Sequence, residues 1–119
     1  MFVDDEKDVL LSFEQTISKS LKDYEFIGVS SGEECLERLT NGEIPDVIFL
    51  DIMMPGLSGW EVYDKLRDNA SWKHIPIVFL TARTDQRAIE VGEALGDDYI
   101  EKPIESDTLL NHIDRILNT

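Results

Sequence analysis

The sequence has little of several residue types, and each shortage excludes a class of protein. One cysteine in 119 residues cannot form an internal disulfide bond, so the fold depends on burying a single hydrophobic core. No apolar run reaches the roughly 18 residues of a membrane-spanning helix, and the first residues lack the basic and hydrophobic regions of a signal peptide. We therefore expect one domain over residues 1–119, in the cytoplasm and without a membrane anchor.

Basic residues are also scarce. Lys and Arg total 11 against 25 Asp and Glu, which gives a net charge of −14 at pH 7. Such a charge repels nucleic acids and anionic membrane surfaces, so we expect no direct nucleic-acid binding. The lone Cys35 lies beside Leu36 and Leu39 at helical spacing, which predicts a buried, unreactive thiol. His74 and His112 have no cysteine or second histidine at ligand spacing, so we expect solvated side chains there rather than a metal site.

Short apolar runs alternate with amphipathic stretches along the whole chain. Apolar residues three or four positions apart predict a first helix through Val9, Leu10, Phe13, Ile17 and Leu21 and a last helix through Leu109, Leu110, Ile113, Ile116 and Leu117. Three more helices are predicted after Ser31, after Ser58 and from about Asp85 to Leu95. Each of the two serines is followed three residues later by Glu, which is the spacing of a capping box.

Strands are predicted between these helices, at residues 1–3, 26–29, 46–51, 75–82 and 99–100. Five strands alternating with five helices predict an α/β fold with a parallel sheet covered on both faces and right-handed crossovers. The strand from Asp46 to Asp51 is an apolar run that delivers one carboxylate before Pro55-Gly56 breaks the pattern. A carboxylate in this place can bind a ligand or cap a turn, and the segment alone does not decide between these interpretations.

Polar residues follow four of the predicted strands: Asp4 and Asp5, then Asp51, Thr81 and Lys102. Parallel strands bring these residues to one rim of the sheet, where three carboxylates raise one another's pKa values unless a cation joins them. Mg²⁺ prefers carboxylate, water and phosphate oxygens, so it is the expected ion. Asp51 can then attack a phosphoryl group as a nucleophile, while Lys102 stabilises the phosphoryl charge and Thr81 donates a hydrogen bond to it.

Four segments carry a resemblance to a known family. Val3-Asp4-Asp5-Glu6, Leu50 to Gly59, Leu80-Thr81-Ala82-Arg83 and Asp97 to Pro103 resemble, in order and spacing, the receiver domain of two-component response regulators. The likeness covers essentially the whole chain. It implies a flavodoxin-like (βα)5 three-layer sandwich whose five-stranded parallel sheet has the order 2-1-3-4-5.

The resemblance also implies a role for each site residue. Asp51 would accept a phosphoryl group from a sensor histidine kinase or a phosphotransfer protein. Asp5 and Asp51 would bind Mg²⁺ together with the backbone carbonyl of Met53, and Asp4 would act largely through water. Thr81 and Lys102 would hold the phosphoryl group.

Three more positions belong to the implied site. Ala82 would be small enough to leave the phosphoryl group room, and the Lys102–Pro103 peptide bond would be cis, which proline tolerates at low cost. Met53 and Arg83 lie two places beyond Asp51 and Thr81, and such bulky groups flank the route of water without positioning it, so we expect slow hydrolysis of the aspartyl phosphate.

Signalling requires that a charge change at Asp51 reaches a surface. We expect the Thr81 hydroxyl to move toward the phosphoryl group and an exposed Tyr99 ring to turn into the vacated space. This change would alter the face made by the fourth helix, fifth strand and fifth helix, roughly Asp85 to Leu95 and Asp98 to Leu117. The resemblance implies that this face binds an output partner, which the sequence does not name, or a second copy in a phosphorylation-dependent homodimer.

One departure from the family pattern and two alternative functions remain. Only three residues precede Asp4, so the central first strand looks clipped at the N-terminus, and we expect lower stability than is usual for this fold. The first alternative is a receiver-like interaction module without phosphorylation, which typically lacks an acid, the threonine or the lysine, although none is missing here. The less favoured alternative is an aspartate-nucleophile phosphatase. Such an enzyme has a second aspartate two residues after the nucleophile, where this sequence has Met53. We expect that the protein is not an enzyme and that it catalyses only its own phosphorylation and dephosphorylation.

Overall fold

The computed structural model describes residues 1–20, 24–81 and 98–117. Five strands form one parallel sheet in the order β2-β1-β3-β4-β5. They are β1 (Phe2–Val3), β2 (Gly28–Val29), β3 (Ile48–Asp51), β4 (Ile77–Thr81) and β5 (Asp98–Glu101). The flavodoxin-like α/β architecture and the strand order predicted from the sequence are thus confirmed.

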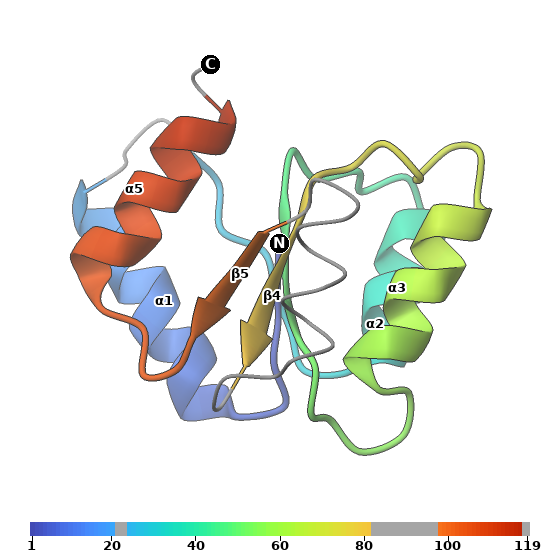
Figure 1. Ribbon diagram of the computed structural model, residues 1–119, viewed down its shortest axis with the longest axis horizontal. Helices are drawn as coiled ribbons and strands as arrows, with labels where there is room; N and C mark the ends of the chain where they lie inside the picture. The colour runs from blue at the N-terminus through green and yellow to red at the C-terminus, as the bar shows by residue number, and fades with distance from the viewer. Residues whose placement is uncertain (21–23, 82–97, 118–119) are drawn as a thin grey trace.

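Helices cover both faces of this sheet (Figure 1). The described helices are α1 (Lys7–Ser20), α2 (Gly32–Thr40), α3 (Gly59–Asp68) and α5 (Ser106–Leu117). Helices α1 and α5 lie on one face and α2 and α3 on the other, which gives the predicted three layers. The fourth predicted helix, from Asp85 to Leu95, lies outside the described residues. None of the described helices is long and apolar enough to cross a membrane.

The core consists of two clusters, one on each side of the sheet. Alternate strand residues such as Val3, Leu50 and Phe79 join the cluster under α2 and α3. Their neighbours, such as Phe2 and Phe49, join the cluster under α1 and α5, where the rings of these two residues stack at 4.5 Å. The continuous apolar runs in the sequence therefore reflect strands that are buried on both faces.

The starts of α2 and α3 differ in how they are capped. Ser58 and Glu61 form the complete capping box that the sequence predicts for α3. Ser31 accepts from the Glu34 amide as predicted, but the Glu34 carboxylate does not return to Ser31. It accepts instead from the amide and the hydroxyl of Ser30, at 3.0 and 3.3 Å. The predicted box at Ser31 is therefore only half formed, because Ser30 offers two donors to the same carboxylate oxygen.

Strand β2 is shorter than the predicted segment 26–29. It lies at the edge of the sheet and pairs only with β1, whose two residues limit the ladder to Phe2 with Gly28 and Val3 with Val29. Strand β4 begins at Ile77 rather than Ile75. Pro76 lies between these positions and has no N–H to contribute to the ladder. Strand β3 begins at Ile48 rather than Asp46, and β5 extends one residue beyond the predicted 99–100 at each end. All these corrections concern strand ends, and none changes the order of the sheet.

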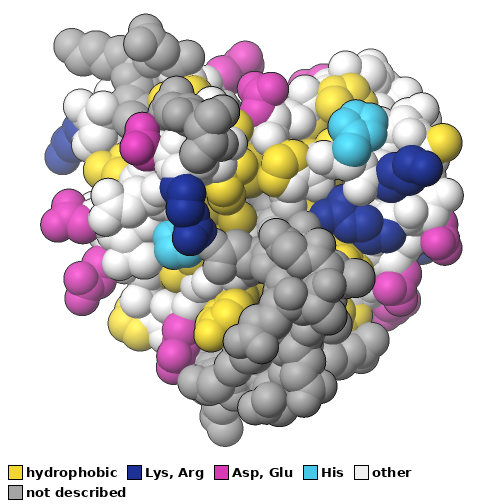
Figure 2. All heavy atoms as spheres, turned by 45° about the horizontal axis from the view of Figure 1, so that its top comes forward, with side chains coloured by type: hydrophobic (Ala, Val, Ile, Leu, Met, Phe, Trp, Pro, Cys, Tyr) yellow, Lys and Arg dark blue, Asp and Glu magenta, His cyan; other side chains and the backbone are white. Residues whose placement is uncertain are grey.

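Met1 occupies an unusual position at the amino edge of the sheet. Its amine donates to the carbonyl of Val47 at 2.9 Å, and burial lowers the pKa of this amine to about 6. A cavity of about 290 Å³ lies beside it, lined mostly by apolar residues of β1, α1, α5 and the segments that precede β2 and β3. Figure 2 brings the upper edge of Figure 1 forward and shows hydrophobic side chains in the middle of this view, with acidic ones around its outline.

Cys35 packs in the core below Met1. Its thiol donates to the Met1 sulfur at 3.8 Å, and burial raises its pKa to about 12. The predicted burial of this thiol is confirmed, and the raised pKa disfavours the thiolate, which is the reactive form of cysteine.

Candidate functional site

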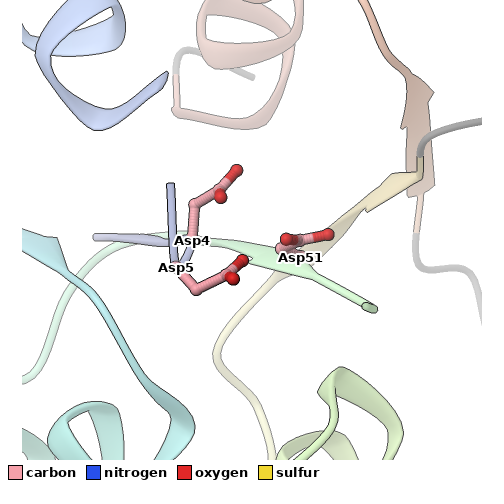
Figure 3. A group of neighbouring side chains, drawn as sticks. All are labelled: Asp4, Asp5 and Asp51. Atoms are coloured by element: carbon pink, nitrogen blue, oxygen red, sulfur yellow. The ribbon is translucent and has the colours of Figure 1, made fainter. Parts of the chain in front are cut away.

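The carboxyl edge of the sheet gathers three aspartates from two strands. Val3 pairs with Leu50, so Asp4, the next residue of one strand, lies level with Asp51, the last residue of the other. Figure 3 shows the side chains of Asp4, Asp5 and Asp51 directed into one space. One carboxylate oxygen from each lies within 4.8 Å of the others. The register of two parallel strands thus builds the cluster.

Lys102 reaches this cluster from the end of β5, the edge strand of the sheet. Thr81 pairs with Glu101, so Lys102 follows the end of β5, and the Lys102–Pro103 peptide bond is cis. Its ammonium nitrogen lies 2.8 Å from Asp4 Oδ2 and 3.6 Å from Asp51 Oδ2. A single cation therefore contacts two of the three aspartates.

Burial distinguishes the three aspartates. Asp4 is 0% exposed and Asp51 3% exposed, whereas Asp5 lies at the surface. Both oxygens of Asp4 are engaged, Oδ1 by the Glu6 amide at 2.9 Å and Oδ2 by Lys102. Asp4 is consequently fixed in place, while the exposed Asp5 side chain borders the same space.

The charges of the site shift two pKa values. Burial raises the pKa of Asp51 to about 6; the Lys102 charge and the Met53 amide oppose this shift, and the charges of Asp4 and Asp5 add to it. Burial by itself lowers the pKa of Lys102, but its hydrogen bond to Asp4 and the surrounding carboxylates raise the pKa overall. At neutral pH the site therefore holds a charged ammonium and more negative charge than this one cation offsets.

This excess of negative charge fits a divalent cation. The donors are carboxylate oxygens, which hard ions such as Mg²⁺ prefer. In the described part of the chain, Asp4, Asp5 and Asp51 are the group of acidic, histidine or cysteine side chains placed to hold a metal ion. Neither histidine belongs to this group. His74 is exposed as expected, whereas His112 is half-buried with its Nδ1 2.9 Å from the Thr108 carbonyl, which corrects the expectation of a solvated side chain there.

The loop after β3 borders the same space. The amide of Met53 donates to Asp51 Oδ1 at 3.3 Å, and the Met53 side chain is 73% exposed. The loop closes where the Gly59 amide donates to the Ile52 carbonyl at 2.9 Å. A Cβ atom at Gly59 would lie 2.4 Å from the Asp51 carbonyl oxygen, so only glycine permits this approach of α3 to the strand end.

Four more positions were predicted to belong to the site or to the switch, namely Thr81, Ala82, Arg83 and Tyr99. Thr81 is the last residue of β4, while Ala82 and Arg83 lie outside the described residues. Tyr99 pairs with Phe79 and packs, half-buried, against the cluster under α2 and α3. The sequence predicted an exposed Tyr99 ring, and this prediction is wrong because the ring is half-buried. Strand β5 lies beside β4, and the ring therefore reaches the core cluster under α2 and α3.

One residue near the site was not predicted. A carboxylate oxygen of Glu6 lies 3.9 Å from the Lys102 nitrogen, and Glu6 also lines an open groove with Phe13, Pro103 and Ile104. Its position directly after the aspartate pair was the available signal.

Comparisons with known proteins agree with this geometry. The family model described as the response regulator receiver domain matches residues 1–114. The chain is 39% identical over 89 residues to the transcriptional regulatory protein AfsQ1 of Streptomyces coelicolor, covering 74% of this chain and 38% of that protein. It is 35% identical over 121 residues to the response regulator SaeR of Staphylococcus epidermidis, covering 98% and 49%. The chain thus spans less than half the length of these curated relatives.

Solved structures show the same similarity. The chemotaxis protein CheY4 of Vibrio cholerae has a TM-score of 0.83 at 28% identity, covering 97% of this chain and 94% of the other. The N-terminal domain of a response regulator receiver protein from Methanoculleus marisnigri has a TM-score of 0.74 at 34% identity, covering 99% and 94%.

Proposed function

The chain belongs to the response regulator receiver domain family, and from this premise we propose that Asp51 is the phosphoacceptor of a two-component signalling switch. The observation that carries the proposal is the placement of the Lys102 ammonium between Asp4 and Asp51, beside a cluster of three aspartates. Sensor histidine kinases or phosphotransfer proteins are the proposed donors. A cytoplasmic location is proposed together with this function.

Asp51 is suited to act as the nucleophile. With a pKa of about 6, its carboxylate is mostly ionised at neutral pH. One of its oxygens attacks the phosphorus atom; the new P–O bond forms as the bond from phosphorus to the donor nitrogen breaks, and the donor histidine leaves with the electron pair. The Lys102 ammonium, 3.6 Å from Asp51, is close enough to pair with a phosphoryl oxygen. Asp4 orients that ammonium through the 2.8 Å contact.

Asp4, Asp5, Asp51 and the backbone carbonyl of Met53 are the proposed holders of Mg²⁺. When bound, the ion supplies positive charge that offsets the carboxylates and the incoming phosphoryl group. The buried Asp4 is already engaged by Lys102 and Glu6, which supports a role through water, whereas the exposed Asp5 is free to bind directly.

Further proposed roles concern Thr81, Ala82, Met53 and Arg83. Thr81 donates to a phosphoryl oxygen, and Ala82 leaves space for the group. Met53 and Arg83 flank the path of water, which makes the aspartyl phosphate long-lived. Rearrangement of Thr81 and Tyr99 then carries the signal to the face containing β5 and α5, where an output partner or a second copy binds.

Incubation with Mg²⁺ and a small phosphodonor such as acetyl phosphate, followed by intact-mass measurement, tests the proposal. The switch predicts a stable gain of one phosphoryl group, which Asp51→Asn abolishes. Asp46→Asn, which changes an exposed carboxyl before β3, is the matched control and retains the gain. Continuous release of phosphate would identify an aspartate-nucleophile phosphatase instead, and no mass gain would identify an interaction module.

A further inference from the structure

The loop from Ile52 to Ser58 joins β3 to α3 and contains Met53, the proposed source of the carbonyl ligand. Its two ends are held by short-range contacts. At the start, the Met53 amide donates to Asp51 Oδ1 at 3.3 Å. At the end, the Gly59 amide donates to the Ile52 carbonyl at 2.9 Å. These contacts leave the middle of the loop to be fixed from elsewhere.

A carboxylate on α2 fixes the middle of the loop. The Leu57 amide donates to Glu33 Oε1 at 2.9 Å, across 24 residues of sequence. Gly56 has a φ of +74°, and a Cβ atom there would lie 2.8 Å from the same oxygen. The hydrogen bond from Leu57 is also the largest cause that lowers the pKa of Glu33. The contact is therefore made by an ionised acceptor, which strengthens it relative to a neutral one.

The first turn of α2 presents this carboxylate from a fixed position. Ser31 caps the helix by accepting from the Glu34 amide at 3.1 Å. Gly32 packs so closely against the loop that a Cβ atom there would lie 3.0 Å from Leu57 Cβ and 2.5 Å from Val62 Cγ2. The helix start and the loop thus form one packed unit, although Glu33 itself lies at the surface.

We infer that Glu33 is a positioning residue for magnesium binding, acting through its hydrogen bond to Leu57 on the orientation of the Met53 carbonyl. The inference rests on the proposed function, since it concerns the same ion. Glu33 does not touch the carboxylate cluster, and its effect passes through the backbone of the loop. Without the bond the loop samples other conformations, and binding of the ion must then order it at a cost in affinity.

Three variants test this inference. Glu33→Ala removes the acceptor, whereas Glu33→Gln retains an amide oxygen that can accept from Leu57. Glu37→Ala removes the same charge from an exposed position one turn later on α2 and serves as the control. The first measurement is hydrogen exchange of the Leu57 amide in the metal-free protein. The second is the Mg²⁺ dissociation constant from calorimetry or an NMR titration.

We expect Glu33→Ala to lose protection of the Leu57 amide. We also expect its Mg²⁺ dissociation constant to rise by about threefold to tenfold, which is less than the roughly tenfold to hundredfold typical when a direct partner of a metal ligand is removed. Phosphorylation by a small donor should slow at limiting Mg²⁺ and recover at saturating Mg²⁺. Glu33→Gln should restore most of the affinity and the protection, and Glu37→Ala should change neither.

Each other outcome overturns the inference. Unchanged Mg²⁺ affinity in Glu33→Ala, with Leu57 protection lost, would make the bond purely structural. A Glu33→Gln variant as weak as Glu33→Ala would assign the effect to charge rather than to the hydrogen bond. Failure of the unmodified protein to bind Mg²⁺ would instead overturn the proposed function, so the two failures are distinguishable.

Discussion

The ammonium nitrogen of Lys102 lies 2.8 Å from an oxygen of Asp4, joining the end of β5 to the end of β1 across two intervening strands. The Asp4 side chain is fully buried, and that of Lys102 is 16% exposed. Such a pair contributes to stability chiefly through the penalty that follows when one partner is removed.

Replacing Lys102 with Met tests this relationship. The variant leaves Asp4 buried and without its cation, so the metal-free protein should lose about 3 kcal/mol of unfolding free energy. Added Mg²⁺ should return part of the loss by supplying positive charge to the same carboxylates. Urea unfolding with and without Mg²⁺ measures both effects. Lys19→Met, at an exposed position of α1, is the control, and equal stability of the two variants would contradict the prediction.

The raised pKa of Asp51 predicts how stability depends on pH. The pKa is about 6 in the folded protein against an ordinary value of 3.8, so the folded state binds more protons between these limits. Stability contributed by protonated Asp51 is therefore present below about pH 4 and is lost as the pH rises through 6. Asp51→Asn should remove this loss, so without Mg²⁺ at pH 7 its free energy of unfolding should exceed that of the unmodified protein by about 1–3 kcal/mol.

Urea unfolding between pH 4 and pH 8 in the presence of a chelator checks this expectation. Asp64→Asn is the control, since it changes an exposed carboxyl on α3, outside the site and away from Met1. Parallel stability curves for the unmodified protein and Asp51→Asn would show that burial does not raise the pKa of Asp51.

The lowered pKa of the Met1 amine should make stability rise with pH, in a higher pH range than the loss caused by Asp51. Its pKa falls from 8.0 to about 6 on folding, so the unfolded state binds more protons between these values and stability rises with pH across them. Adding Ile-Leu-Ile before Met1 replaces the amine by an amide and brings apolar groups to the neighbouring cavity. We expect the rise between pH 6 and 8 to disappear and stability to increase by about 1–3 kcal/mol.

Addition of Gly-Ser-Gly is the matched control for this extension. It also removes the buried amine but brings no apolar side chains, so it should abolish the pH trend with a smaller gain in stability. Thermal unfolding at several pH values distinguishes the two. Equal stability of both extensions would show that the cavity beside Met1 does not accept a longer first strand.

The lifetime of the aspartyl phosphate depends on the residues that flank the path of water. Met53→Asn combined with Arg83→Glu introduces polar groups that can orient a water molecule, so the phosphate should be lost about tenfold faster. The decay of the phosphorylated mass at fixed Mg²⁺ measures the rate. Leu11→Asn, which changes an exposed apolar residue of α1, should leave it unchanged. An unaltered rate in the double variant would contradict the proposed roles.

Beryllofluoride, which mimics a phosphoryl group, tests the output surface. Binding should change amide exchange in β5 and α5, residues 98–117, and in the segment 85–95, as well as beside Asp51. The Asp51→Asn variant should show no response to beryllofluoride. Changes confined to the neighbourhood of Asp51 would show that this face does not carry the signal.

The sequence predicted that Asp4, Asp51 and Lys102 lie together, because each of them stands at or directly after the end of a strand. Asp4, Asp51 and Lys102 each come after an apolar run, and parallel strands end at the same edge, so strand order alone brings them together. The Ser58 capping box was likewise readable, since all its contacts lie within one helical turn.

Contacts between distant segments could not be predicted in this way. Glu33 resembles any acidic residue in the first turn of a helix, and nothing in its surroundings indicates a bond to Leu57. The Glu34 carboxylate accepts hydrogen bonds from Ser30 rather than from Ser31. The sequence contains both serines side by side and does not indicate which of them Glu34 contacts. The half-buried state of Tyr99 depends on the packing of β5 against the core, which hydrophobic spacing in a four-residue strand does not specify.

The buried thiol of Cys35 makes this chain suitable for spectroscopic labelling. Because burial raises its pKa to about 12 and leaves it no exposed surface, we expect no reaction with maleimide while the protein is folded. A cysteine introduced at an exposed position of α5, such as Asn111, would then be the single reactive thiol. A fluorophore attached there can follow the state of the protein in real time, without first removing a native cysteine.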